Sequence, residues 1–184
     1  MSRSSSQPGT QAMLRHWREA VPDDRLVHLV KDATRALVRA LQMRLAEHAV
    51  SFGHWTFLRI LWEGDRLTQR ELSERAGVME PTTFAALKAM ERLGYIRRRK
   101  FAGDRKKIYV LLTAKGRALR EQLVPLAEDV NRIAVRGVGT SAIGTTRSVL
   151  LAIIENLDRD ENAADMKMPS TRALSKLTKK RRRS

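Results

Sequence analysis

Seven basic residues and one acidic residue lie between positions 97 and 107. A folded core gains nothing from this crowding of like charge, whereas DNA phosphates relieve the repulsion and release counterions when they are bound. Asp104 precedes Arg105 in a tight turn and can orient its guanidinium, which we expect to enter a minor groove. The alternative is a solvated charged edge that discourages strand pairing. The expected DNA contacts in this cluster are Arg97, Arg98, Arg99, Asp104, Arg105, Lys106 and Lys107.

The segment before this cluster has the pattern of a helix-turn-helix. Thr68 and Glu71 have the spacing of a capping box, which predicts a helix over 69–75. Gly77 supplies the turn, and a second helix is predicted over 80–93, before Gly94. A helix-turn-helix places its second helix in the major groove of DNA. The expected DNA contacts in this segment are Thr68, Gln69, Glu80, Pro81, Thr82, Thr83 and Lys88.

The two faces of the 80–93 helix are assigned from residue spacing. Phe84, Leu87 and Met90 repeat at three residues and are expected to face the core. The exposed side is expected to carry Pro81, Thr82, Thr83 and Lys88. A bare pattern of this kind also fits an ordinary surface helix, but the basic cluster that follows favours DNA.

Four residues near the junction of the first two predicted helices suit a small aromatic acid. An Arg can pair a carboxylate and an indole can cover a ring, which makes His48, His54, Trp55 and Arg59 the candidate effector-binding residues. The alternative is that Trp55 packs in the core, as apolar residues at helical spacing usually do. The four histidines show no metal-binding spacing, so we expect no metal and no cofactor. Nucleophile and phosphate-loop motifs are also missing, so we expect no enzyme.

Composition points to a polyanionic partner. The 184 residues carry a formal net charge of +16, which attracts nucleic acid. No apolar segment is long enough to span a membrane, and no apolar run at the start of the chain resembles a secretory signal. The chain has no cysteine, which fits a reducing compartment. We therefore expect a cytoplasmic protein that associates with the nucleoid when it is bound to DNA.

The elements that must position these residues are mostly helical. Gly and Pro are scarce and the apolar spacing is mainly three and four, whereas the period changes to two after Gly94. We therefore expect a mainly α protein with a small β-hairpin, in which a winged helix-turn-helix is flanked by N- and C-terminal dimerisation helices. The expected regions are a leader that is disordered or partly ordered (1–23), a dimerisation helix and support helix (24–66), the DNA-binding module (67–112), C-terminal dimerisation helices (113–158, the last ending near Leu157) and a basic disordered tail (159–184).

The outer helices carry more apolar surface than the small DNA-binding module can cover. Burial against a second copy of the chain would remove that surface from water. A two-fold dimer predicts a pseudo-palindromic DNA site with half-sites about one helical turn apart. A bundle within one chain is the alternative.

An ordered series of motifs resembles the MarR family of bacterial regulators over roughly 26–157. The motifs lie at 67–78, 81–83, 90–91, 94–96, 103–107 and 112–116. The resemblance implies a homodimer with two winged modules and repression that is relieved by a small molecule, often a phenolic or aromatic carboxylate. Family members frequently carry a polar residue and then Arg where this chain has Phe84 and Ala85, and another Arg in place of Ala89. We therefore do not assign the base contacts of the family to Phe84, Ala85 and Ala89.

The sequence thus predicts a homodimeric transcriptional regulator of double-stranded DNA, and specifically a repressor released by a small aromatic acid or related effector. The alternative is a basic protein that binds nucleic acid without sequence preference, in an architectural or RNA-associated role. A regulator should keep one operator bound against excess random DNA, whereas a general binder should not.

Overall fold

The computed structural model describes residues 13–15, 26–101 and 104–163, apart from the side chains of 104–106. Most of the predicted leader and the tail from residue 164 onward lie outside the described residues. The chain divides into two compact units, 1–134 and 135–184.

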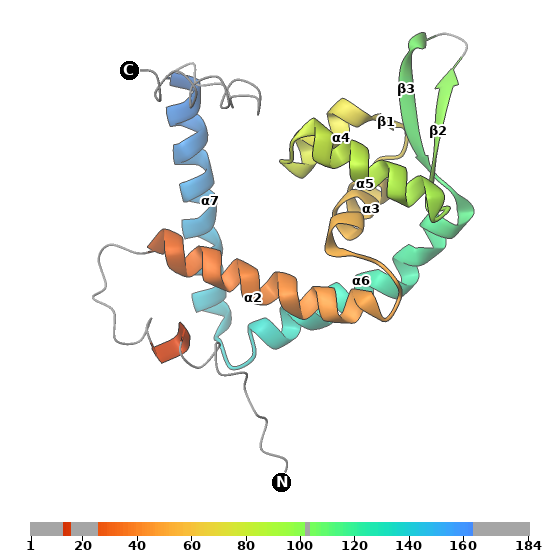
Figure 1. The fold of residues 1–184 in the computed structure, drawn as a ribbon. Helices are drawn as coiled ribbons and strands as arrows, with labels where there is room; N and C mark the ends of the chain where they lie inside the picture. Colours follow the sequence, from red (N-terminus) through yellow and green to blue (C-terminus); the bar gives the residue numbers. More distant parts are fainter. Residues whose placement is uncertain (1–12, 16–25, 102–103, 164–184) are drawn as a thin grey trace, which may run out of the picture. The chain divides into compact units, whose positions relative to one another are not determined.

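The first unit is mainly helical with a small antiparallel sheet, as predicted (Figure 1). Its elements are α2 (Leu26–Ala46), α3 (Phe52–Glu63), β1 (Leu67–Thr68), α4 (Gln69–Ala76), α5 (Glu80–Arg92), β2 (Ile96–Phe101), β3 (Asp104–Leu112) and α6 (Ala114–Ala134). The helix-turn-helix is α4 and α5, and the wing is the hairpin formed by β2 and β3.

The sheet has three strands in the order β1-β3-β2, not the two of the predicted hairpin. The additional strand is β1, whose Leu67 and Thr68 pair with Val110 and Tyr109 of β3. On the other side of β3, Ile96 pairs with Leu112, which fixes the base of the wing. Strand β1 therefore attaches the start of the helix-turn-helix to the wing.

Helix α3 lies at the centre of the first unit. It buries Trp55, Phe57, Leu58, Ile60 and Leu61, so apolar side chains point in several directions rather than along one stripe. It packs against α2, α4, α5 and α6, and a helix that is apolar on most sides has to be surrounded in this way. The helix-turn-helix and the wing therefore share one hydrophobic core.

Helix α2 uses only its C-terminal half in that core. Leu41 and Leu45 are buried, whereas Leu26, Leu29 and Leu37 are exposed. The buried half packs against α6, where Arg44 forms a 3.2 Å ion pair with Asp129. The N-terminal half of α2 thus presents apolar side chains that nothing in the described part of its own unit covers.

The second unit contains α7 (Thr140–Ala163). This helix continues to Ala163, so the predicted end near Leu157 and the predicted tail boundary at residue 159 were wrong. Residues 158–162 are polar and are followed by Ala163, but the stretch includes neither Gly nor Pro. Without a helix breaker, the backbone hydrogen bonds of the helix continue through it. None of the described residues of this unit is buried, and its exposed large apolar residues include Val149, Leu150, Leu151, Ile154 and Leu157.

Within the described residues, no helix has the length and apolar character required to cross a membrane.

Candidate DNA-binding surface

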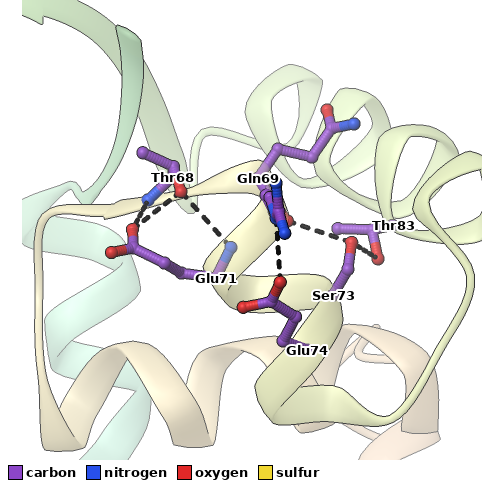
Figure 2. A network of polar contacts seen from close by, with 7 residues as sticks. Thr68, Gln69, Glu71, Ser73, Glu74 and Thr83 are labelled. Carbon is purple, nitrogen blue, oxygen red and sulfur yellow. Dashed lines mark hydrogen bonds and ion pairs between the residues drawn. The ribbon is translucent and has the colours of Figure 1, made fainter. Parts of the chain in front are cut away.

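The start of α4 is held by the predicted capping box (Figure 2). The Glu71 N–H donates to Thr68 Oγ1 at 3.3 Å, and the Thr68 N–H donates to Glu71 Oε2 at 2.7 Å. The hydrogen bonds from the backbone and side chain of Thr68 hold the pKa of Glu71 below its usual value. Because Thr68 also pairs with β3, the cap connects helix α4 to the wing.

The turn between α4 and α5 follows the prediction. Gly77 has a φ of +62°, the left-handed conformation that favours glycine, and the Val78 N–H donates to the Ser73 carbonyl at 3.2 Å. Beyond the turn, Ser73 Oγ lies 2.8 Å from Thr83 Oγ1 (Figure 2). This buried contact sets how α5 packs on α4.

Two expectations about the faces of α5 were wrong. Thr83 is fully buried at 0% exposure, and Phe84 is 48% exposed, although Thr83 was expected outside and Phe84 in the core. Thr83, Leu87 and Met90 are spaced at four and three residues, so they share one face of the helix, and all three are buried. Thr83 can occupy the core because Ser73 satisfies its hydroxyl, and it is therefore removed from the candidate DNA contacts.

The other candidates on α5 lie at the surface. Glu80, Pro81, Thr82 and Lys88 are exposed, and Arg92 joins them at the end of the helix. Thr68 and Gln69, at the start of α4, are half-buried.

The three arginines of β2 have different environments. Arg97 and Arg99 are exposed, whereas Arg98 is half-buried and its guanidinium binds the Glu91 carboxylate through Nη2 at 2.5 Å and Nε at 2.9 Å. The side-chain hydrogen bond from Arg98 is the main reason that the pKa of Glu91 is lowered. Arg98 therefore ties β2 to α5, and its charge is already balanced.

Lys107 is also exposed on β3. The side chains of Asp104, Arg105 and Lys106 lie outside the described residues, so the entry of Arg105 into a minor groove stays a prediction.

Two neighbouring residues that sequence reasoning did not single out hold the wing in place. Asp65 accepts a hydrogen bond from the Leu112 N–H at 3.0 Å and pairs with Arg117 at 2.9 Å. Arg66 lies with its guanidinium carbon 4.0 Å from the centre of the Phe101 ring. Both follow Gly64, the C-cap of α3. An Asp-Arg pair before a two-residue strand carries no recognisable signal, because its partners are about 35 to 50 positions away in the sequence.

The four candidate effector residues have separate environments. Trp55 is 6% exposed and packs edge-to-face on Trp62 at 5.6 Å, as the core alternative for this residue predicts. His54 lies 6.4 Å from the Tyr95 ring, and its buried Nδ1 has no hydrogen-bond partner among the described residues. Burial lowers the pKa of His54. Arg59 is exposed and His48 is half-buried.

Comparisons with known proteins agree with this architecture. The family model described as MarR family matches residues 50–108. The chain is 28% identical over 156 residues to the HTH-type transcriptional regulator TtmR of Methylorubrum extorquens (strain PA1), covering 82% of this chain and 75% of the relative. It is 28% identical over 109 residues to the homoprotocatechuate degradative operon repressor of Escherichia coli, covering 59% of this chain and 74% of the relative.

A solved structure gives the same result for the fold. The crystal structure of transcriptional regulator PA3341 matches with a TM-score of 0.65 and 31% identity over 72% of this chain and 97% of the matched chain. With the helix-turn-helix, wing and flanking helices in the positions described above, the chain belongs to the MarR family of transcriptional regulators and carries its winged-helix DNA-binding fold.

Proposed function

We propose that this protein is a homodimeric repressor that binds a pseudo-palindromic operator in duplex DNA. The observation that carries the proposal is the pairing, in one compact unit, of an outward-facing α5 surface with a basic wing. Thr82 and Lys88 lie on the exposed side of α5, and Arg97 and Arg99 are exposed on β2. Helix α5 enters the major groove while the wing contacts the flanking phosphates.

Dimerisation accounts for the unburied apolar surface. Helix α7 has exposed large apolar side chains over residues 149–157, and the N-terminal half of α2 exposes Leu26, Val27 and Leu29. A second copy that covers these residues would remove them from water. Two copies related by a two-fold axis would present two α5 helices to half-sites about 34–36 Å apart. Sedimentation equilibrium tests this arrangement, and a monomer at micromolar concentration would contradict it.

The proposed effector is a small aromatic acid. The E. coli relative is named for the degradation of homoprotocatechuate, which is such an acid. In this chain, His54 offers an unpaired buried nitrogen, and Arg59 offers a cation on the same helix. Trp55 packs in the core, so His48, His54 and Arg59 are the residues left to contact a ligand. A rise in melting temperature on titration with aromatic acids supports the site; no shift across a broad panel contradicts it.

Competition binding tests the main proposal. The DNA fragments recovered with the protein from its own cells supply the probe, and binding is followed by fluorescence anisotropy. A repressor keeps the recovered duplex bound against a large excess of random duplex, whereas a general nucleic-acid binder loses it as readily as any other sequence. Arg105→Ala should weaken binding strongly and leave the fold intact; unchanged affinity would refute the role proposed for the wing.

A further inference from the structure

We propose that Phe84 and Ala85 recognise the 5-methyl groups of thymines by apolar contact in the major groove. The inference rests on the proposed function, because it requires α5 to lie in that groove. Its starting observation is the 48% exposure of Phe84 in the second turn of α5.

The rotation of α5 about its axis determines which residues are available to DNA. Thr83, Leu87 and Met90 are buried against the core, and a helix turns about 100° per residue. Ala85 therefore lies nearly opposite the buried face, beside Pro81 and Lys88 in the exposed surface, while Phe84 lies on the flank of that surface.

The contacts of Phe84 show which flank it occupies. The guanidinium carbon of Arg98 lies 6.0 Å from the centre of the Phe84 ring, and Arg98 is itself held by Glu91. The ring is thus placed between α5 and the base of the wing. Because Arg98, which is itself fixed by Glu91, lies over one side of the ring, the ring is presented to DNA in a restricted position, which lowers the entropy lost on binding.

The surrounding charge selects DNA as the partner. Lys88 and Arg92 are exposed on the same side of α5 as Phe84, so the apolar ring lies beside positively charged side chains. An apolar protein partner would have to desolvate these cations, whereas a duplex pairs them with phosphates and offers methyl groups in the groove between.

The chemistry at positions 84 and 85 limits what can be recognised. Neither side chain can donate or accept a hydrogen bond, so neither can distinguish guanine from adenine by its groove atoms. The apolar feature of the major groove is the C5-methyl of thymine, which cytosine lacks, and Phe and Ala are among the residues that contact it. The operator should therefore require a thymine beneath α5 in each half-site.

Replacement of single thymines by deoxyuridine tests the proposal, because it deletes the methyl group and preserves base pairing. The probe is the duplex recovered with the protein, scanned one thymine at a time. For the unmodified protein we expect a loss of about threefold to tenfold in affinity at one or two positions per half-site, the size expected for one buried methyl group. Phe84→Ala should abolish the difference between thymine and deoxyuridine at one of them.

Two further variants serve as controls. Lys88→Ala should weaken binding to the thymine and deoxyuridine duplexes by the same factor, so that the ratio of their affinities stays unchanged. The reason is that the Lys88 side chain contributes to binding but does not contact the methyl group. Phe84→Leu retains an apolar side chain and should keep part of the preference for thymine over deoxyuridine. Circular dichroism melting checks that each variant is folded.

The outcomes separate the inference from the proposed function. If the unmodified protein does not prefer the recovered duplex to random DNA, the proposed function fails. If it prefers that duplex and every deoxyuridine substitution leaves affinity unchanged, the thymine contact is overturned and the proposed function survives. A thymine preference that persists in full in Phe84→Ala would also overturn the role of Phe84.

Discussion

Ser73 Oγ and Thr83 Oγ1 lie 2.8 Å apart in the buried contact between α4 and α5. Ser73 is 5% exposed and Thr83 is fully buried, and Ser73 Oγ also lies 3.0 Å from the Gln69 carbonyl oxygen. Figure 2 shows the two hydroxyls meeting between the helices. A buried hydroxyl without a partner is costly, so this pair favours one rotation of α5 over others.

The first prediction concerns that pair. Thr83→Val keeps the shape of the side chain but removes the hydroxyl, and it should lower the free energy of unfolding by about 0.5–1.5 kcal/mol, because one buried hydrogen bond is lost and Ser73 keeps only the Gln69 carbonyl oxygen as a partner. Urea denaturation measures the change. Thr82→Val, on the exposed side of the same helix turn, is the matched control and should change stability by less than about 0.5 kcal/mol. Equal effects at the two positions would show that the hydroxyl contact has no special role.

The second prediction concerns the approach of α6 to the loop before the wing. A Cβ atom on Gly116 would lie 2.0 Å from the Tyr95 carbonyl oxygen, which is backbone and itself accepts a hydrogen bond from the Thr113 N–H. Gly116→Ala should therefore destabilise the protein by about 1–3 kcal/mol or more, through overpacking. Gly53→Ala is the control, because its nearest neighbour would be at an ordinary 3.9 Å. Thermal denaturation of both variants tests the difference; a Gly116→Ala protein as stable as the control would contradict the close approach.

The third prediction concerns pH. The pKa of Glu91 is lowered in the folded protein, chiefly by the hydrogen bond from Arg98, so the folded state favours the ionised carboxylate. The stabilisation is fully present above the unfolded pKa of Glu, about 4.3, and is lost as the pH falls through the lower folded value. Glu91→Gln should thus have a lower melting temperature than the unmodified protein at pH 7. The difference between the two melting temperatures should disappear as the pH is lowered.

A melting series from neutral to acidic pH measures that gap. Glu128→Gln, which removes the same charge from an exposed position on α6, should show no such convergence. A gap for Glu91→Gln that is independent of pH would mean that the ion pair does not stabilise the fold.

The fourth prediction concerns the support of the wing. Arg66 covers the Phe101 ring at 4.0 Å and lies 5.5 Å from the centre of the Tyr109 ring. Arg66→Ala should cost about 0.5–1 kcal/mol, the usual value for an exposed cation–π contact, and should speed hydrogen exchange at the β2 and β3 amides. Arg70→Ala, an exposed arginine on α4 that pairs with Glu74, should leave wing exchange unchanged. Faster wing exchange in both variants, or in neither, would disprove a bracing role for Arg66.

The fifth prediction separates two adjacent arginines. Arg97 is exposed, so Arg97→Ala should reduce the salt dependence of DNA binding by about one unit of slope and spare stability. Arg98 is paired with Glu91, so Arg98→Ala should instead reduce stability. Anisotropy titrations at several salt concentrations, together with urea denaturation, distinguish the two effects; the reverse assignment would show that Arg98 is the phosphate contact.

Local signals in the sequence determined much of the fold. The capping box of Thr68 and Glu71 and the left-handed turn at Gly77 act over three or four residues, so they specify the limits of α4 without help from the rest of the chain. The change of period after Gly94 likewise indicated the wing. These features sufficed to predict a winged helix-turn-helix and to place its basic residues.

Only the tertiary structure decided which face of α5 is buried. Leu87 and Met90 can share one side of a helix either with Phe84 or with Thr83. Hydrophobicity alone favours Phe84. The buried position goes to Thr83 because Ser73, ten residues earlier on α4, supplies a hydroxyl partner. Strand β1 and the pairing of Arg98 with Glu91 were decided in the same way, by partners that are adjacent in space and distant or unmarked in the sequence.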